Sequence, residues 1–235
     1  MRAIILAGGK GTRLQPYTTV LPKPLMPIGD IPIMEIVIRQ LRYYGFKKIT
    51  LTVGHQAALI ETFFGDGKKL GVDVDYSREK TPLGTAGPLS LIDDLNETFL
   101  MMNGDLLTNL DYREMFRFHR NVNAFATLAL FQKRVKIDLG VINADERGFI
   151  KHYIEKPTMK YEVSTGIYVF QPQVQNYIPK GKKLDLPNLI KSLIKNNKKV
   201  IGYRFNGYWL DIGRYEDYQE AIKLFEKQRH KFLPC

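Results

Sequence analysis

The sequence predicts an α/β fold in which a largely parallel sheet carries helices on both faces. Three observations predict it: short apolar runs alternate with amphipathic segments, glycines end several of those segments, and 44% of the 235 residues are apolar against 25% charged. Such a composition can bury a core and is not typical of a disordered chain. Strands and helices that alternate at this spacing are typical of βαβ units.

The first half of the chain gives the clearest elements. The helix expected from Ile33 to Tyr44 has apolar residues at helical spacing and stops at Gly45, a good helix terminator. We expect strands at Ala3–Leu6, Ile49–Val53, Val72–Tyr76, Phe99–Met102 and Ala126–Phe131, and helices at Ile33–Tyr44, Ala58–Phe64, Pro88–Leu95 and Tyr112–His119.

The second half is less regular. We expect strands at Gly140–Asn143, Ile150–Ile154, Ile167–Phe170 and Val200–Phe205, and helices at Leu186–Lys195 and Tyr215–Lys227. No linker, internal repeat or low-complexity segment separates the halves, so we expect a single domain over residues 1–235. The extra strands of the second half could form a lid over the edge of the sheet.

The net charge of the chain indicates what kind of molecule it binds. It is +11, from 35 basic and 24 acidic side chains, which suggests an anionic partner such as nucleic acid, a membrane surface or a phosphorylated small molecule. Aromatic residues are not interleaved with the lysines as in a stacking groove, so we expect no nucleic acid. No apolar stretch approaches the roughly 18 residues of a membrane span, and the start does not resemble a signal peptide. The only cysteine, Cys235, excludes an intrachain disulfide. We expect a soluble, cytoplasmic protein.

A glycine-rich loop from Gly8 to Leu14 follows the first expected strand directly. It lacks the Gly-Lys-Ser/Thr order of a P-loop, and Leu14 stands where the dinucleotide fingerprint has its third glycine. Glycines after a first parallel strand let backbone N–H groups approach phosphate oxygens closely. The guanidinium of Arg13 adds a planar fork suited to phosphate. Because ligands of open α/β sheets bind outside the carboxyl ends of the strands, the loop predicts a phosphate-binding site rather than a plain turn.

Two charged side chains further along the chain fit the same site. Lys23 stands between Pro22 and Pro24, which stiffen the backbone around it. A rigidly held lysine suits charge stabilisation in phosphoryl chemistry, although a lysine in such a turn is usually only exposed. The expected strand at 99–102 leads into Asp105, whose carboxylate should emerge at the carboxyl edge of the sheet beside the glycine loop. The four histidines have no zinc-binding spacing and no Gly-x-Ser-x-Gly motif is present, which disfavours zinc and acyl-enzyme chemistry.

Several short motifs, taken in their order and spacing, resemble the signature of the sugar-1-phosphate nucleotidyltransferases, the nucleotide-sugar pyrophosphorylases. They are Leu6–Leu14, Pro22–Pro24, Leu83–Ala86, Asn103–Asp105, Glu155–Pro157, Thr165–Tyr168 and Trp209–Gly213. The likeness runs through nearly the whole chain and is closest to the mannose-1-phosphate guanylyltransferase branch, without the left-handed β-helix domain of some members. It implies a three-layer αβα, Rossmann-like nucleotide-binding fold of the nucleotide-diphospho-sugar transferase type. About residues 1–110 would be the nucleotide-binding half, and about 111–235 the sugar-phosphate-binding half with a C-terminal helix.

The resemblance also implies a set of site residues. The nucleotide would be bound by Leu6, Ala7, Gly8, Gly9, Gly11, Thr12, Arg13, Glu79, Gly84, Thr85, Asn103 and Gly104. Catalysis would use Arg13, Lys23 and Asp105, and Mg²⁺ would be held by Asp105 and Asp211. The sugar phosphate would be bound by Gly140, Glu155, Lys156, Thr165 and Gly166. Leu139 stands where many members have an aromatic residue, which puts the sugar contacts there in doubt.

The implied reaction joins an NTP and a sugar 1-phosphate into an NDP-sugar and pyrophosphate. The attacking phosphate is already ionised near neutral pH, so no protein base is required and catalysis is positioning plus charge stabilisation. The partners would be these two substrates, with no nucleic acid and no membrane; a homo-oligomer stays open. Two other classes also stay open: a catalytically silent regulatory relative, and a nucleic-acid-binding protein that uses the net charge.

The base preference depends on Glu79. Uridylyl- and thymidylyltransferases usually have glutamine at the position that Glu79 resembles, six residues before Thr85. A carboxylate only accepts hydrogen bonds, and guanine offers two adjacent donors, whereas uracil and thymine present carbonyl oxygens. We therefore expect GTP as the nucleotide and a mannose- or heptose-type sugar 1-phosphate, with a thymidylyl-, uridylyl- or cytidylyltransferase as the alternative. Glu79 could instead pair with Arg78 or Lys80 or point to solvent.

Overall fold

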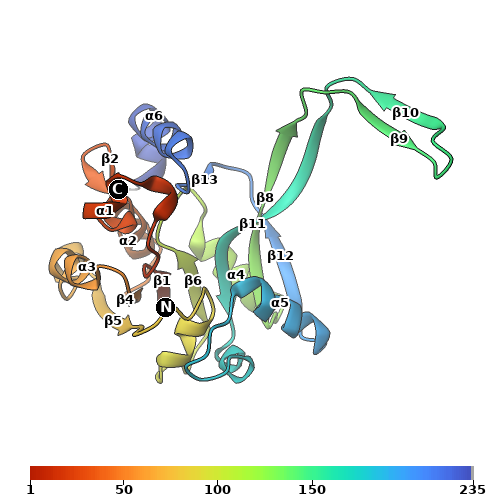
Figure 1. Ribbon diagram of the computed structural model, residues 1–235. Helices are drawn as coiled ribbons and strands as arrows, with labels where there is room; N and C mark the ends of the chain where they lie inside the picture. The colour runs from red at the N-terminus through yellow and green to blue at the C-terminus, as the bar shows by residue number, and fades with distance from the viewer. Residues whose placement is uncertain (234–235) are drawn as a thin grey trace.

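The computed structural model describes residues 1–233, so Cys235 lies outside the described residues. Its centre is a seven-stranded sheet with the order β12-β8-β11-β6-β1-β4-β5 (Figure 1). These strands are β1 (Arg2–Leu6), β4 (Lys48–Val53), β5 (Asp73–Arg78), β6 (Phe99–Asn103), β8 (Ala126–Lys136), β11 (Thr158–Phe170) and β12 (Val200–Arg204). β11 runs antiparallel to β6 and β8, and the remaining neighbours are parallel. The mixed, largely parallel sheet is thus confirmed.

Apolar layers cover both faces of this sheet. Successive strand residues point to opposite faces, so Ala3 and Ile5 of β1 pack in one core cluster while Ile4 packs in another. The first cluster contains side chains of α2 (Ile33–Tyr43), α3 (Ala57–Phe64) and α4 (Tyr112–Asn121). The second contains α5 (Leu186–Lys195) and the 3-10 helices Gly87–Leu91 and Pro172–Tyr177. The three-layer arrangement is therefore confirmed.

A third cluster lies beside the sheet and closes the fold with the end of the chain. Phe225 and Phe232 of α6 (Tyr215–Phe232) pack there with Leu14 at the end of the glycine loop and with Met26 and Ile28 beyond it. The short elements of that region are α1 (Tyr17–Val20), β2 (Pro27–Ile28) and β3 (Ile31–Pro32). Helix α6 begins where expected, and its backbone leaves helical geometry at Gln228, one residue past the expected end at Lys227. A further helical turn after this kink carries Phe232, which is fully buried.

Two expectations for the elements are wrong. The helix expected at Pro88–Leu95 is a 3-10 helix, Gly87–Leu91, with tight bonds such as Leu89 N to Ala86 O, and the chain is extended again at Ile92. The second half does not form a lid over the sheet edge. Instead β8 and β11 continue past the sheet, paired only with each other from Phe131 to Lys136, and project as an arm (Figure 1). The tip of the arm is the hairpin β9 (Val141–Ala144) and β10 (Ile150–Ile154).

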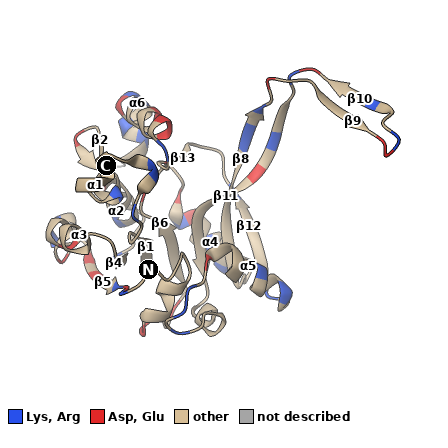
Figure 2. Cartoon of the chain, in the orientation of Figure 1, with Lys and Arg blue, Asp and Glu red and all other residues tan. Residues whose placement is uncertain are grey.

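The excess positive charge is spread over several elements. Lys and Arg residues occur along the arm, α5 and α6, with acidic residues among them on the arm and α6 (Figure 2). Among residues 1–233, no helix is both long and apolar enough to cross a membrane.

Buried His119 gives the fold a dependence on pH. The side chain is 2% exposed, and its Nδ1 lies 2.9 Å from Thr127 Oγ1 of β8. Burial lowers the pKa of His119 to about 4. Because the unfolded chain then binds a proton at a higher pH than the folded chain, stability is full above the ordinary pKa near 6.5 and falls as the pH drops toward 4.

We predict that His119→Gln flattens this dependence. Between pH 7.5 and pH 4.5 the native protein should lose up to about 3 kcal/mol of unfolding free energy more than the variant, since each unit of pKa shift is worth about 1.4 kcal/mol. Urea unfolding at both pH values measures it. Equal losses in the two proteins would contradict the assignment.

Candidate active site

The cavity that contains the glycine loop, called the main cavity below, lies at the carboxyl ends of the central parallel strands. It has a volume of about 520 Å³, and its wall includes Leu6 at the end of β1, Thr52 of β4, Glu79 just after β5 and Asn103 at the end of β6. Crevices at this edge are where open α/β sheets bind ligands. All the residues implied for the nucleotide line this one cavity: Leu6, Ala7, Gly8, Gly9, Gly11, Thr12, Arg13, Glu79, Gly84, Thr85, Asn103 and Gly104. Lys23 and Asp105 line it as well.

Sequence reasoning missed some of the lining residues. Thr52 and Gly213 both line the cavity, and neither was assigned to it. Thr52 stands near the carboxyl end of the second parallel strand, so the sheet-edge rule could have found it. Gly213 belongs to the motif Trp209–Gly213, but no sequence signal ties that motif to the glycine loop.

The glycine loop is held in shape by short contacts around Gly11. Gly11 has φ +62°, and a Cβ there would lie 2.9 Å from Thr18 Cγ2. Thr18 Oγ1 donates to Gly11 O at 2.8 Å, and Leu14 N donates to the same oxygen at 2.9 Å. The left-handed backbone and the close approach both favour glycine, which explains the residue type at this position.

Lys23 joins two carboxylates that are far apart in the sequence. It begins the 3-10 helix Lys23–Leu25, and its Nζ makes an ion pair with Asp105 and lies 3.9 Å from Asp211 Oδ1. The Lys23 and Asp105 side chains are mostly buried, at 14% and 17% exposure, whereas Asp211 is 43% exposed. A cation held between two carboxylates offsets their mutual repulsion.

A small two-stranded sheet brings the two aspartates together. β7 (Leu106–Thr108) follows Asp105 at once and pairs antiparallel with β13 (Trp209–Asp211), so that Asp211 faces Leu106. Ile212 N donates to Asp105 O at 3.1 Å. Neither strand was expected from the sequence, because each has only three residues.

The surroundings of Asp211 disfavour its charged form. Its pKa is raised, first because the carboxyl is partly removed from water and then because Asp105 is close, while Lys23 and Arg13 act in the opposite direction. The carboxylates of Asp105 and Asp211 supply oxygen ligands of the kind that suits Mg²⁺, which usually takes one or two carboxylates and substrate phosphates. The part of the chain that the structure describes has no cluster of three or more His, Cys, Asp or Glu for a metal.

Arg13 lies between the main cavity and a second one. Its guanidinium packs on Gly213, where a Cβ would lie 3.2 Å from the nearer terminal nitrogen. The second cavity has a volume of about 680 Å³ and is lined by Arg13 and Asp211, by Phe131 and Lys133 at the base of the arm, and by Trp209. Trp209 Nε1 donates to Thr165 O at 2.9 Å.

One carboxylate oxygen of Glu79 accepts a hydrogen bond from its own loop. Oε2 accepts from Leu83 N at 2.8 Å, and Oε1 faces Gly8 so closely that a Cβ there would collide with it. Arg78 pairs instead with Glu61. Glu79 therefore does not pair with Arg78, and it is one of the residues that line the main cavity.

The residues implied for the sugar phosphate divide into two groups. Gly166 in β11 has φ +78°, and a Cβ there would lie 2.6 Å from Asn103 Nδ2, so it adjoins the main cavity. Thr165 is buried beside it, and its Oγ1 donates to Ala129 O at 3.0 Å. Both lie where the register of β11 shifts against β8.

The other group lies on the arm, outside both cavities. Gly140 packs against the ring of Tyr153, and the Tyr153 hydroxyl donates to Glu155 Oε2 at 2.8 Å. Lys156 is exposed and has φ +44°. In this conformation the structure does not bring Gly140, Glu155 or Lys156 to the main cavity.

Loss of the Lys23 charge should destabilise the fold, because it leaves two carboxylates unpaired. We predict that Lys23→Met lowers the unfolding free energy at pH 7 by about 2–4 kcal/mol, somewhat less than the roughly 3–5 kcal/mol for a fully buried pair, because Asp211 is partly exposed. The double variant with Asp105→Asn should recover part of this loss. Thermal unfolding of the two single variants and the double variant completes the cycle, and additive losses would contradict the coupling.

The chain is similar to a large set of known proteins. A family profile described as "Nucleotidyl transferase" matches residues 2–228. A UTP–glucose-1-phosphate uridylyltransferase of Synechocystis is 38% identical over 95% of this chain and 63% of that protein. A mannose-1-phosphate guanylyltransferase of Mycobacterium tuberculosis is 32% identical over 92% of this chain and 62% of that protein. This chain thus spans less than two thirds of the length of these relatives.

Solved structures share the fold. A Bacillus anthracis protein described as a glucose-1-phosphate thymidylyltransferase, in complex with sucrose, aligns with a TM-score of 0.78 and 27% identity over 95% of this chain and 94% of that chain. HddC from Yersinia pseudotuberculosis aligns with a TM-score of 0.73 and 24% identity over 95% of this chain and 99% of that chain.

Proposed function

This chain belongs to the nucleotidyl transferase family, and from that premise we propose that it transfers a nucleotidyl group from an NTP to a sugar 1-phosphate. The products are an NDP-sugar and pyrophosphate. One observation carries the proposal: the glycine loop, Lys23, the segment around Glu79 and the end of β6 come from four separate stretches of sequence and line one cavity. The sequence relatives support the same reaction class.

The reaction needs charge stabilisation more than proton transfer. An oxygen of the sugar phosphate attacks the α-phosphorus, the bond to the departing pyrophosphate breaks, and no proton has to be removed from the nucleophile. The backbone of Gly8–Thr12 and the guanidinium of Arg13 hold the triphosphate. Lys23 offsets the charge that develops at the α-phosphate. These groups are fixed before the substrates arrive, which is the physical basis of the rate enhancement.

Asp105 and Asp211 are the proposed ligands of Mg²⁺. When bound, the ion neutralises phosphate charge as a Lewis acid. The chain itself positions the two carboxylates: the β7–β13 pair holds them close together. Without bound Mg²⁺, the Lys23 ammonium pairs with Asp105 and lies near Asp211.

The acceptor side is proposed around Thr165 and Gly166, which adjoin the cavity at Asn103. Gly140, Glu155 and Lys156 are proposed to bind the sugar hydroxyls and phosphate, a role that requires the hairpin at the tip of the arm to approach the sheet. We further propose residues 1–110 as the nucleotide half and 111–235 as the sugar half. A cytoplasmic location without nucleic acid or membrane partners is part of the same proposal.

GTP is the proposed donor, with a mannose- or heptose-type sugar 1-phosphate as acceptor. Glu79 lines the cavity and supports guanine: Oε2 already accepts from Leu83 N, but each carboxylate oxygen has a second lone pair that can accept from a donor of that base. Uridylyl transfer is the second candidate, and the 38% identity to the Synechocystis uridylyltransferase favours it.

Pyrophosphate release tests the reaction and the metal together. With an NTP, a sugar 1-phosphate and Mg²⁺, the native protein should release pyrophosphate. Asp105→Asn should lower kcat by on the order of a hundredfold, since a neutral amide is a poor ligand for a hard cation. EDTA should abolish turnover and Mg²⁺ restore it. Asp66→Asn, a change at an exposed turn, is the control and should leave the rate unchanged. Turnover that survives both EDTA and Asp105→Asn would contradict the metal role.

A second prediction concerns the base. The native enzyme should prefer GTP over UTP and dTTP in kcat/KM. Glu79→Gln should erode that preference about ten- to a hundredfold, the value of about 1–3 kcal/mol for one mismatched polar contact. Competition between the NTPs at a fixed sugar phosphate measures the ratio. A native preference for UTP or dTTP would overturn the assignment of GTP and leave the reaction class intact.

A further inference from the structure

The loop that carries Gly84 and Thr85 is bonded to a distant segment, the entry to α5. Leu184 N donates to Leu83 O at 2.9 Å. In return Ala86 N and Gly87 N both donate to Leu184 O, at 2.9 and 3.0 Å. Gly84 and Thr85 line the main cavity, so one wall of the proposed nucleotide site is built on the second half of the chain.

The first turn of α5 and this loop form two reciprocal hydrogen bonds between side chains and main-chain N–H groups. Asp185 is the N-cap residue of α5, but its carboxylate makes no capping bond to its own helix. Instead Oδ1 accepts from Thr85 N at 3.2 Å, and Thr85 Oγ1 accepts from Leu186 N at 2.7 Å. An N-cap carboxylate normally accepts an N–H of its own first turn. Here the Thr85 hydroxyl of the loop accepts the N–H of the helix, and the Asp185 carboxylate accepts the N–H of the loop.

Asp111 shows the ordinary arrangement in the same chain. It is the N-cap residue of α4, which like α5 has ten residues, and its Oδ1 accepts from Glu114 N at 2.9 Å. The two aspartates occupy equivalent helix positions and differ in what their carboxylates hold. Asp111 stabilises its own helix, whereas Asp185 fixes a wall of the cavity.

The loop and the start of α5 approach each other too closely at Gly84 to leave room for a side chain. Its φ is +77°, and a Cβ would lie 2.5 Å from Asp185 Oδ1 and 2.7 Å from Leu184 O. Glycine is therefore required for the loop to approach the carboxylate this closely. The carboxylate of Asp185 and the carbonyl of Leu184 together fix the position of the turn at Gly84 and Thr85.

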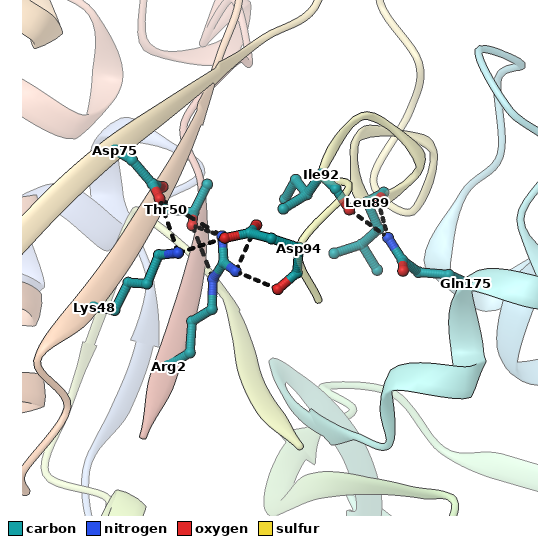
Figure 3. Close-up of polar contacts among 8 residues, drawn as sticks. All are labelled: Arg2, Lys48, Thr50, Asp75, Leu89, Ile92, Asp94 and Gln175. Carbon is teal, nitrogen blue, oxygen red and sulfur yellow. Dashed lines mark hydrogen bonds and ion pairs between the residues drawn. The ribbon is translucent and has the colours of Figure 1, made fainter. Parts of the chain in front are cut away.

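The far end of the same segment is anchored independently (Figure 3). Gln175 Nε2 donates to Leu89 O at 2.8 Å and to Ile92 O at 2.7 Å. Arg2 donates to the carbonyl and the carboxylate of Asp94 at 2.9 and 2.7 Å. With residues 89–94 held there, and with Ala86 and Gly87 still bonded to Leu184 O, loss of the Asp185 contact would loosen only the turn at Gly84 and Thr85.

We propose that Asp185 is a positioning residue for the nucleotide. It does not line the cavity and acts through the main chain of Thr85, holding one wall at a fixed place relative to the glycine loop. This inference rests on the proposed nucleotide site. It places control of nucleotide affinity in the second half of the chain, outside the glycine loop and the base-facing Glu79.

The test compares Asp185→Ala, Asp185→Asn and Asp111→Ala. Asp185→Ala should raise the Kd and KM for the NTP about tenfold, the effect of one lost hydrogen bond to a charged acceptor. The KM for the sugar phosphate and kcat should stay within about twofold. Asp185→Asn should restore most of the affinity, because the amide oxygen still accepts. Asp111→Ala should lower Tm by loss of a cap and leave the nucleotide Kd unchanged.

Binding and hydrogen exchange separate this inference from the reaction itself. In Asp185→Ala the amide of Thr85, which loses its acceptor, should exchange faster, whereas the amide of Ile92, which is bonded to Leu89 O, should not. A nucleotide Kd within about twofold of native in Asp185→Ala, or an equal rise in Asp111→Ala, would overturn the inference. If the native protein binds NTP but releases no pyrophosphate, the proposed reaction fails, and a Kd raised only in Asp185→Ala still supports the positioning role. A native protein that binds no NTP overturns both.

Discussion

The electrostatics of the site depend on a single lysine held between two aspartates. Lys23 pairs with Asp105 and lies near Asp211, in a place where all three side chains are partly or mostly removed from water. Two carboxylates this close would repel each other strongly at low dielectric, and the ammonium offsets that repulsion. The pKa of Asp211 is still raised, first by partial burial of the carboxyl and then by the neighbouring Asp105. A site arranged in this way holds its charges in place before any phosphate or metal arrives.

The fold supplies that arrangement from parts that are remote in the sequence. Parallel strands β1, β4, β5 and β6 end at one edge of the sheet, and their following loops form the cavity wall. The short β7–β13 pair then brings Asp211 to Asp105. The second half of the chain contributes again at the entry to α5, which holds the loop at Thr85. The two halves therefore share one site, although the arm carries Glu155 and Lys156 away from it.

The central architecture, the glycine loop and Asp105 were predictable from the sequence because they depend on local pattern, whereas Glu79, Gly84 and Thr85 were assigned to the same cavity by resemblance. Apolar periodicity and glycine stops located the strands and helices, and the sheet-edge rule placed the glycine loop and Asp105. The approach of Asp211 to Asp105 was implied only by resemblance, since three-residue strands leave no periodic signal. The arm was not predictable either: its residues pair only with each other, so no burial pattern distinguishes a projecting hairpin from a covering one. The exchange of caps at Asp185 is invisible in the sequence, where the residue looks like an ordinary N-cap.

The central claim is that the cavity at the strand ends binds the triphosphate, with its charge offset by Lys23 and by Mg²⁺ on the two aspartates. A crystal structure with an NTP analogue and Mg²⁺ tests this claim most directly. The account predicts the triphosphate on the backbone of Gly8–Thr12, the ion on Asp105 and Asp211, and the Lys23 ammonium turned from the carboxylates toward the α-phosphate. A nucleotide bound outside this cavity, or a Lys23 that stays on Asp105 with the ion elsewhere, would contradict it.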